Sequence, residues 1–170
     1  GEAGVFLAPF YSPGSDFIAI SNGFVADLIL RDFQGEDIAF RTEVFNQQYL
    51  NIFKGFFKVY EDQYAAMGNA DIMLDKITWD YANYWGSIAL LYFNNKLTDL
   101  DFMLSIARPM QTLDALNATM QQHFQTRNVD NTTARPRFND TLDNPFLKAL
   151  NTDLQTPLTD DQLRKQLINN

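Results

Sequence analysis

The sequence lacks cysteine, has a single histidine and has no long apolar run, and each absence removes a class of function. Without cysteine there is no disulfide, no thiolate nucleophile and no cysteine-ligated zinc. His123 alone cannot build a histidine metal site, and its polar neighbours predict an exposed side chain. The most apolar stretch, residues 84–93, is much shorter than the roughly 20 residues of a membrane-spanning helix. It predicts a core helix, and no membrane span is expected.

Basic residues are scarce, with 13 Lys and Arg against 21 Asp and Glu, so the net charge is −8. An acidic surface repels nucleic acid and anionic lipid, and neither is an expected partner. The first residues do not form a secretory signal, which predicts a cytoplasmic location. Aromatic residues, by contrast, are abundant at 14% and predict a folded chain with a substantial core.

Apolar residues recur at helical spacing and predict a mainly α-helical, bundle-like fold. Residues 5–8 predict one short N-terminal extended segment or strand. Gly35 is expected to end the first helix, and Thr159 with Gln162 forms a capping box at the start of the last. Helices are expected over 16–33, 37–67, 70–94, 98–107 and 109–127, after Pro145, and over 160–168.

The turn before the first helix carries the most specific pattern in the chain. Gly14 follows residues 11–13, and Ser15 is placed to cap a helix that begins at Asp16. A helix N-terminus presents unpaired N–H groups and a partial positive charge, and glycine lets a flat or anionic group approach the backbone. The pattern predicts a seat for an electron-rich ring edge or an anion. The alternative is an ordinary loop before a helix.

The spacing of Phe6, Pro9, Ser12 and Gly14 resembles the FxxPxxSxG signature of flavin-dependent halogenases. Residues 1–3, Gly-Glu-Ala, are similar to the Gly-Asp-Ala element that holds the flavin ribityl chain in the wider family of FAD-dependent monooxygenases and halogenases. The resemblance implies a flavoprotein, an oxidoreductase whose cofactor is FAD. The helical remainder is compatible with the C-terminal, substrate-side region of such an enzyme.

The resemblance also implies roles for individual residues. Glu2 would approach the ribityl hydroxyls, and Pro9, Gly14 and Ser15 would border the flavin ring. Glu2 stands where the family has Asp and is one methylene longer, which puts its contact in doubt.

Beside the ring, the resemblance places an active-site turn and a halide pocket at Phe6, Ser12 and Gly14. Pro13 interrupts this turn and has no N–H with which to bind a halide. Halogenation is therefore a weaker implication than proximity to a flavin, and hydroxylation or dehydrogenation stays open.

Several parts of such an enzyme are absent from the sequence: the G-x-G-x-x-G turn that binds the FAD pyrophosphate, the catalytic Lys and the W-x-W-x-I-P segment. No catalytic residue is assigned, and the chain alone is expected to bind no FAD and to be inactive. An N-terminal FAD-binding region is the expected partner. The lysines in helical stretches are expected to be solvated: Lys54, Lys58, Lys76 and Lys96.

This interpretation divides one domain, residues 1–170, into three regions. Residues 1–34 are a flavin-facing strand, turn and helix. Residues 35–128 are the helical core, and residues 129–170 are a polar loop with C-terminal helices.

A second interpretation is a helical ligand-binding or protein-interaction module without catalytic activity, whose aromatic side chains enclose an apolar ligand or partner. A metal-carboxylate bundle is a weaker alternative, because the Glu-x-x-His pairs of di-iron bundles are absent, and no metal is expected. The carboxylates that suggest it are Glu61, Asp62, Asp71 and Asp75.

Apolar residues near the start predict self-association. In a flavoenzyme they would lie against the cofactor region, so in this chain they should present an uncovered face and favour a homodimer. The residues concerned are Val5, Phe6, Leu7, Phe10 and Phe17.

Overall fold

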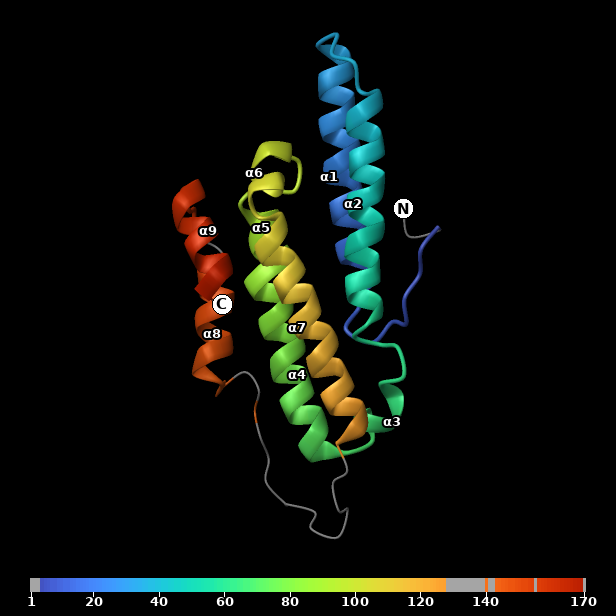
Figure 1. Cartoon of the computed structure of the whole chain (residues 1–170), viewed down its shortest axis with the longest axis vertical. Helices are drawn as coiled ribbons and strands as arrows, with labels where there is room; N and C mark the ends of the chain where they lie inside the picture. The colour runs from blue at the N-terminus through green and yellow to red at the C-terminus, as the bar shows by residue number, and fades with distance from the viewer. Residues whose placement is uncertain (1–3, 128–139, 141–142, 155, 170) are drawn as a thin grey trace.

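Four long helices form two antiparallel hairpins that stand side by side (Figure 1). The computed structural model describes residues 4–127, 140, 143–154 and 156–169. The first hairpin consists of α1 (Pro13–Phe33) and α2 (Ala39–Phe57), and the second of α4 (Ala70–Tyr84) and α7 (Ala107–Thr126). The mainly α fold is therefore confirmed. The described residues contain no strand, and residues 6–8 have no regular secondary structure.

Three short elements connect α4 to α7: a π-helical turn η1 (Trp85–Ala89), α5 (Leu90–Phe93) and α6 (Leu100–Ser105). Because η1 and α5 continue α4 without a break, the predicted helix over 70–94 is confirmed. The Asp99 carboxylate caps α6 by accepting a 3.0 Å hydrogen bond from the N–H of Phe102. Pro109 lies in the first turn of α7, where its missing N–H breaks no helical hydrogen bond.

The single helix predicted over 37–67 is wrong, because α2 ends early and a turn separates it from the short α3 (Tyr64–Met67). In this turn Val59 is buried, and its carbonyl accepts a 3.1 Å hydrogen bond from the Lys76 ammonium on α4. The Val59 carbonyl thus accepts its hydrogen bond from a side chain of a distant helix. Periodicity along the sequence cannot reveal such a contact.

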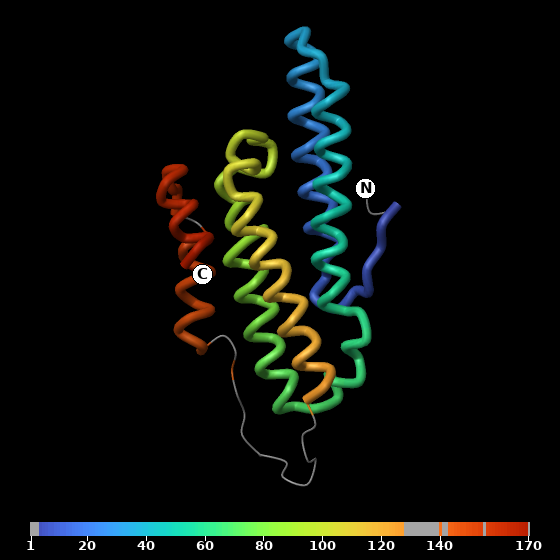
Figure 2. The backbone as a smooth tube through the Cα atoms, viewed as in Figure 1, coloured from blue at the N-terminus to red at the C-terminus, as the bar shows by residue number. Residues whose placement is uncertain are grey.

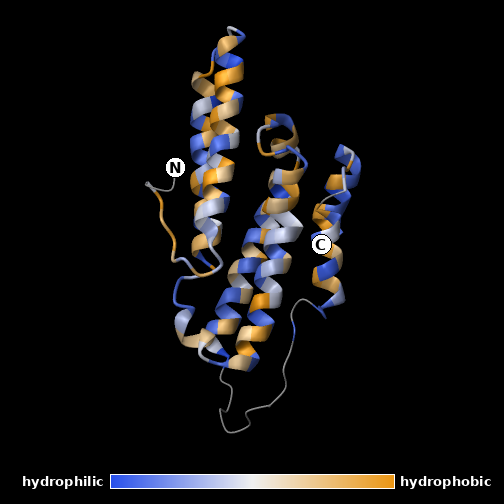
Figure 3. Cartoon of the chain, turned by 180° about the vertical axis from the view of Figure 1, so that it is seen from behind, coloured by the Kyte–Doolittle hydropathy of each residue, from blue (hydrophilic) through white to orange (hydrophobic). Residues whose placement is uncertain are grey.

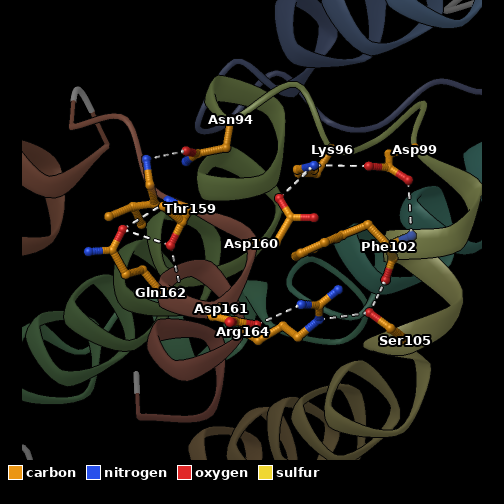
Figure 4. Close-up of polar contacts among 11 residues, drawn as sticks. Asn94, Lys96, Asp99, Phe102, Ser105, Thr159, Asp160, Asp161, Gln162 and Arg164 are labelled. Carbon is orange, nitrogen blue, oxygen red and sulfur yellow. Dashed lines mark hydrogen bonds and ion pairs between the residues drawn. The ribbon is translucent and has the colours of Figure 1, made fainter.

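The last two helices are α8 (Pro145–Asp153) and α9 (Asp160–Asn169). They lie beside the second hairpin, on the side away from α1 and α2 (Figure 2). Figure 4 shows the capping box at the start of α9, in which the Thr159 N–H donates to Gln162 Oε1 at 2.9 Å and the Gln162 N–H donates to Thr159 Oγ1 at 3.4 Å. The predicted capping box is confirmed. Arg164 of α9 also donates to Ser105 Oγ of α6 at 3.1 Å.

Aromatic rings fill the core of the first hairpin. Phe24 of α1 stacks on Phe45 of α2 with ring centroids 4.6 Å apart, and Phe17 meets Phe56 edge-on at 5.2 Å. Burial of such a side chain stabilises the fold by roughly 1.5–3 kcal/mol. Much of the aromatic content therefore serves the core.

Apolar residues also continue along α1 and α2 toward the tip of their hairpin (Figure 3). Ile29, Phe33 and Phe40 are exposed there. Despite this apolar surface, none of the helices in the described residues combines the length and apolar content that crossing a membrane requires.

The uncovered face predicted near the start is only partly present. Phe6 is 70% exposed and Phe10 is 40% exposed, but Leu7 and Phe17 are buried in the core and Val5 is half-buried. The prediction is wrong for Leu7 and Phe17, because both belong to the buried core, where Phe17 packs against Tyr49 and Phe56 of α2. Self-association through Phe6 and Phe10 stays a prediction.

Candidate functional site

A cavity of about 740 Å³ lies between the two hairpins. The turn before α1, together with α2, α4, η1 and α7, contributes to its walls. Its size falls within the roughly 300–1,000 Å³ of sites that bind small molecules. Much of the lining is apolar or aromatic, and includes Ile52, Phe56, Tyr81, Tyr84, Ile88 and Met110.

A buried ion pair lies at one side of this cavity. Lys76 is 0% exposed and Asp80 is 7% exposed, and both lie on α4, one turn apart. The distance between Lys76 Nζ and Asp80 Oδ2 is 2.9 Å. Lys76 Nζ also donates to the carbonyl of Val59 at 3.1 Å and to Gln121 Oε1 at 2.6 Å. Each of the three ammonium protons thus has an acceptor.

The Asp80 carboxylate is equally well partnered. Its Oδ1 accepts a 2.7 Å hydrogen bond from Gln121 Nε2, and its Oδ2 accepts a 3.2 Å bond from the Tyr11 hydroxyl. Gln121 Nε2 also donates to Asn117 Oδ1 at 3.1 Å, and Trp79 Nε1 donates to the same oxygen at 3.0 Å. The network therefore ties the N-terminal turn, α4 and α7 together.

Burial controls the protonation of these groups. Desolvation lowers the pKa of Lys76 and raises the pKa of Asp80, while the attraction between the two charges opposes both shifts. Burial also raises the pKa values of the Tyr11 and Tyr60 hydroxyls, and the negative charge of Asp80 adds to both shifts. Both hydroxyls therefore remain protonated hydrogen-bond donors.

A second carboxylate reaches the cavity from the first turn of α1. Asp16 is half-buried and accepts a hydrogen bond from the Tyr84 hydroxyl of α4. Burial raises the pKa of Asp16, and the hydrogen bond from Tyr84 opposes this shift. In the described part of the chain, no nitrogen of a basic side chain lies within 4.0 Å of the Asp16 carboxylate.

The turn before α1 has an unusual backbone. Tyr11 and Ser12 both lie in the left-handed region, with φ of 66° and 53°. Such a conformation costs of order 1–3 kcal/mol for a residue other than glycine. A 2.9 Å hydrogen bond from the Ser12 N–H to the Pro9 carbonyl closes the turn, and the Tyr60 hydroxyl donates to the Phe10 carbonyl. With the bond from Tyr11 to α4, these contacts hold the turn in place.

The residues of the N-terminal signature converge on a second, more open hollow of about 310 Å³. Its lining includes the described residues to which the resemblance assigns flavin or halide contacts: Phe6, Pro9, Ser12, Gly14 and Ser15. Glu2 lies outside the described residues. Pro13 lines both hollows, so the turn forms a wall between this signature hollow and the large cavity.

The predicted cap at Ser15 is wrong. The α1 helix begins at Pro13, and the Ser15 hydroxyl donates to the Ser12 carbonyl at 3.1 Å from inside the first turn. Ser12 precedes the helix and makes no side-chain cap. Proline explains the earlier start, because its fixed φ suits the first helical position. Gly14 does not have a positive φ, so this turn does not use the left-handed freedom of glycine.

The expectation that all four lysines are solvated is wrong for Lys76, which is fully buried. Lys54 is exposed, and Lys58 and Lys96 are half-buried in ion pairs. The available signal for a buried pair was Lys76 followed by Asp80 four residues later. That spacing ordinarily indicates a solvent-facing pair on a helix. Here the packing of α7 against α4 buries the pair.

Metal binding has no support from the carboxylates considered above. Within the described ranges no group of three or more acidic or histidine side chains is arranged to hold an ion. Glu61 and Asp62 are exposed, and Asp75 pairs with Arg127.

No protein-family profile matches the chain, and no curated protein or solved structure is significantly similar to it. Function therefore has to be inferred from the two hollows and the turn between them.

Proposed function

We propose that this chain is the substrate-side region of a flavin-dependent oxidoreductase related to the halogenases, in which the turn over residues 9–14 separates flavin from substrate. The position of the turn carries this proposal. The signature residues line one hollow, Tyr11 and Asp16 line the large cavity, and Pro13 lines both. A ring in the signature hollow and an apolar substrate in the cavity would then be divided by a single turn of backbone.

The signature hollow suits the edge of a planar ring. The ring of Phe6 is largely exposed there, and Gly14 leaves room at the start of α1. The N–H groups of Gly14 and Ser15 belong to the first turn, where a helix supplies no acceptor. A bound flavin would supply the redox chemistry, while these residues would place its edge. Pro13 offers no N–H, and this supports flavin contact better than halide binding.

A second candidate function is a ligand-binding module that uses no flavin. The observation that favours it is the large cavity itself, whose lining includes several aromatic rings. On this alternative the signature hollow is a surface feature, and apolar ligands bind without any redox cofactor.

Flavin content separates the two candidates. We expect the complete gene product that contains this chain, purified without added cofactor, to show flavin absorbance and to release FAD on denaturation. Gly14→Val should reduce the bound flavin at least about tenfold, because it adds bulk to a residue that lines the signature hollow. Gly23→Val on the same helix is the matched control, since a Cβ at Gly23 meets nothing within 4 Å.

A flavin-free wild-type gene product that still binds apolar ligands would favour the module. Equal flavin loss in Gly14→Val and Gly23→Val would show that the signature hollow is not the flavin contact.

A further inference from the structure

Three carboxylates line the large cavity, and they differ in what surrounds them. Asp114 is paired with Lys58. Asp80 has the Lys76 ammonium at 2.9 Å, together with donors from Gln121 and Tyr11. Its acceptor capacity is engaged and its charge is balanced within the protein. The Asp80 carboxylate therefore serves contacts within the protein.

Asp16 has far fewer partners. Its carboxylate accepts a hydrogen bond from Tyr84, and no basic side chain in the described residues reaches it. An ionised carboxylate offers about four lone-pair positions. With one hydrogen-bond donor and no counter-charge among the described residues, the Asp16 carboxylate keeps acceptor positions available to a ligand.

The aromatic part of the lining also suits a cation. Aromatic rings in its lining, including those of Tyr60, Tyr81 and Tyr84, present electron-rich faces that attract cations. Two lysines also line the cavity. Lys58 is paired with Asp114, with both carboxylate oxygens at 2.7 Å from Nζ, and Lys54 is exposed to solvent. No comparable pairing balances Asp16.

We propose that the cavity binds an apolar molecule carrying a protonated amine, and that the Asp16 carboxylate accepts the hydrogen bonds of that ammonium group. The apolar body lies among the aromatic and aliphatic side chains of the cavity. This inference deepens the proposed function, because it names the chemistry of the molecule on the substrate side of the turn. It rests on the proposal that the cavity is a ligand site.

Three probes with the same apolar body test the inference on the 170-residue chain: 4-phenylbutylamine, 4-phenylbutanol and 5-phenylpentanoate. Titration calorimetry at neutral pH is expected to give the amine at least about tenfold tighter binding than the alcohol or the acid, since a charge-assisted hydrogen bond is roughly twice as strong as a neutral one. Equal affinities, tighter binding of the alcohol or acid, or no binding of any probe would overturn the inference.

Asp16→Asn keeps the size of the side chain and removes its charge. We expect it to weaken amine binding about tenfold and to change alcohol binding by less than about twofold. Asp114→Asn is the matched control, because Asp114 lines the same cavity but is paired with Lys58. It should leave the preference for the amine intact. Loss of that preference in Asp114→Asn but not in Asp16→Asn would show that the ammonium group binds Asp114, and it would contradict the inference.

The wild-type comparison of the three probes needs no variant, so it decides the matter even if Asp16→Asn folds poorly. Flavin content is measured separately on the complete gene product. Flavin binding without amine preference would contradict this inference alone, and amine preference without flavin would contradict the flavoenzyme proposal alone.

Discussion

Asp80 and Asp16 border the same cavity, yet one is enclosed by partners and the other is nearly without them. Asp80 is bound by a lysine, a glutamine and a tyrosine that come from three parts of the chain. Among the described residues, Asp16 has only the Tyr84 hydroxyl as a partner. The comparison teaches that burial of a carboxylate does not by itself mark a functional site. What marks it is burial without compensation.

Position in the helix explains how each carboxylate is tolerated. Asp80 lies within α4, where no free N–H groups are available, so it needs the Lys76 ammonium. Asp16 lies in the first turn of α1, and the positive end of the helix dipole favours a negative charge there by about 0.3–1 kcal/mol. The helix end therefore lets Asp16 remain without a cationic partner.

The largest loss of stability is expected from removing the cation that balances the Asp80 charge. Lys76→Met removes the cation and leaves the Asp80 charge buried, which should lower the free energy of unfolding by about 3–5 kcal/mol. Urea denaturation followed by circular dichroism measures the change. Adding Asp80→Leu to Lys76→Met should restore much of the loss, because no buried charge then remains. A double variant no more stable than Lys76→Met would contradict this account.

The Tyr11 hydroxyl offers a smaller test of the same network. Tyr11→Phe removes one donor from Asp80 and loosens the strained turn, and we expect a loss of about 1.5 kcal/mol. Tyr81→Phe is the control, since the Tyr81 ring also lines the cavity but its hydroxyl makes no hydrogen bond within the described residues. Equal losses in the two variants would mean that the hydrogen bond to Asp80 contributes little.

Local rules account for much of the fold. Gly35 has a φ of 83°, which few other residues adopt, and it ends the first helix as the sequence predicts. The capping box at Thr159 and the first-turn position of Pro109 are likewise properties of a few adjacent residues. Such features depend on short-range sterics and hydrogen bonds, so the sequence contains them.

The candidate site could be predicted only in part. Phe6, Pro9, Ser12 and Gly14 were recognisable from their spacing, and they do line one hollow. The pairing of Lys76 with residues of α7 depends on how distant helices pack, and nothing near Lys76 in the sequence indicates it. The large cavity has the same origin, because it exists only where two hairpins meet.

Asp16→Asn tests the other side of the comparison between Asp80 and Asp16, because it should barely affect stability. We expect the free energy of unfolding to change by less than about 1 kcal/mol at neutral pH, since burial of the charge and the helix dipole oppose each other. Burial raises the pKa of Asp16 above its ordinary value of 3.8. The folded state therefore holds this proton more tightly than the unfolded state does.

It follows that wild type should lose stability relative to Asp16→Asn as the pH rises from 3.8 through the raised pKa of Asp16. Tyr84 and Tyr60, the other titratable groups that influence Asp16, stay protonated throughout this range because burial raises the pKa of each. Thermal melts at a series of pH values measure the difference. A stability difference of the opposite slope would show that the Asp16 charge is stabilised in the fold.

The smallest effect is expected where a carboxylate is paired but exposed. Asp114 of α7 binds Lys58 beyond the end of α2, with both carboxylate oxygens at 2.7 Å from Nζ, and the two residues line the cavity from opposite hairpins. Because Asp114 is largely in water, its charge is well solvated without Lys58, and the pair should contribute only about 0.5 kcal/mol. A double-mutant cycle with Lys58→Met and Asp114→Asn measures this coupling, which should shrink as salt is added. A coupling as large as the effect of Lys76→Met, or one insensitive to salt, would mean that the two hairpins are held together at the cavity as firmly as Asp80 is held by its network. The contrast between the buried network of Asp80 and the exposed pair of Lys58 and Asp114 would then be wrong.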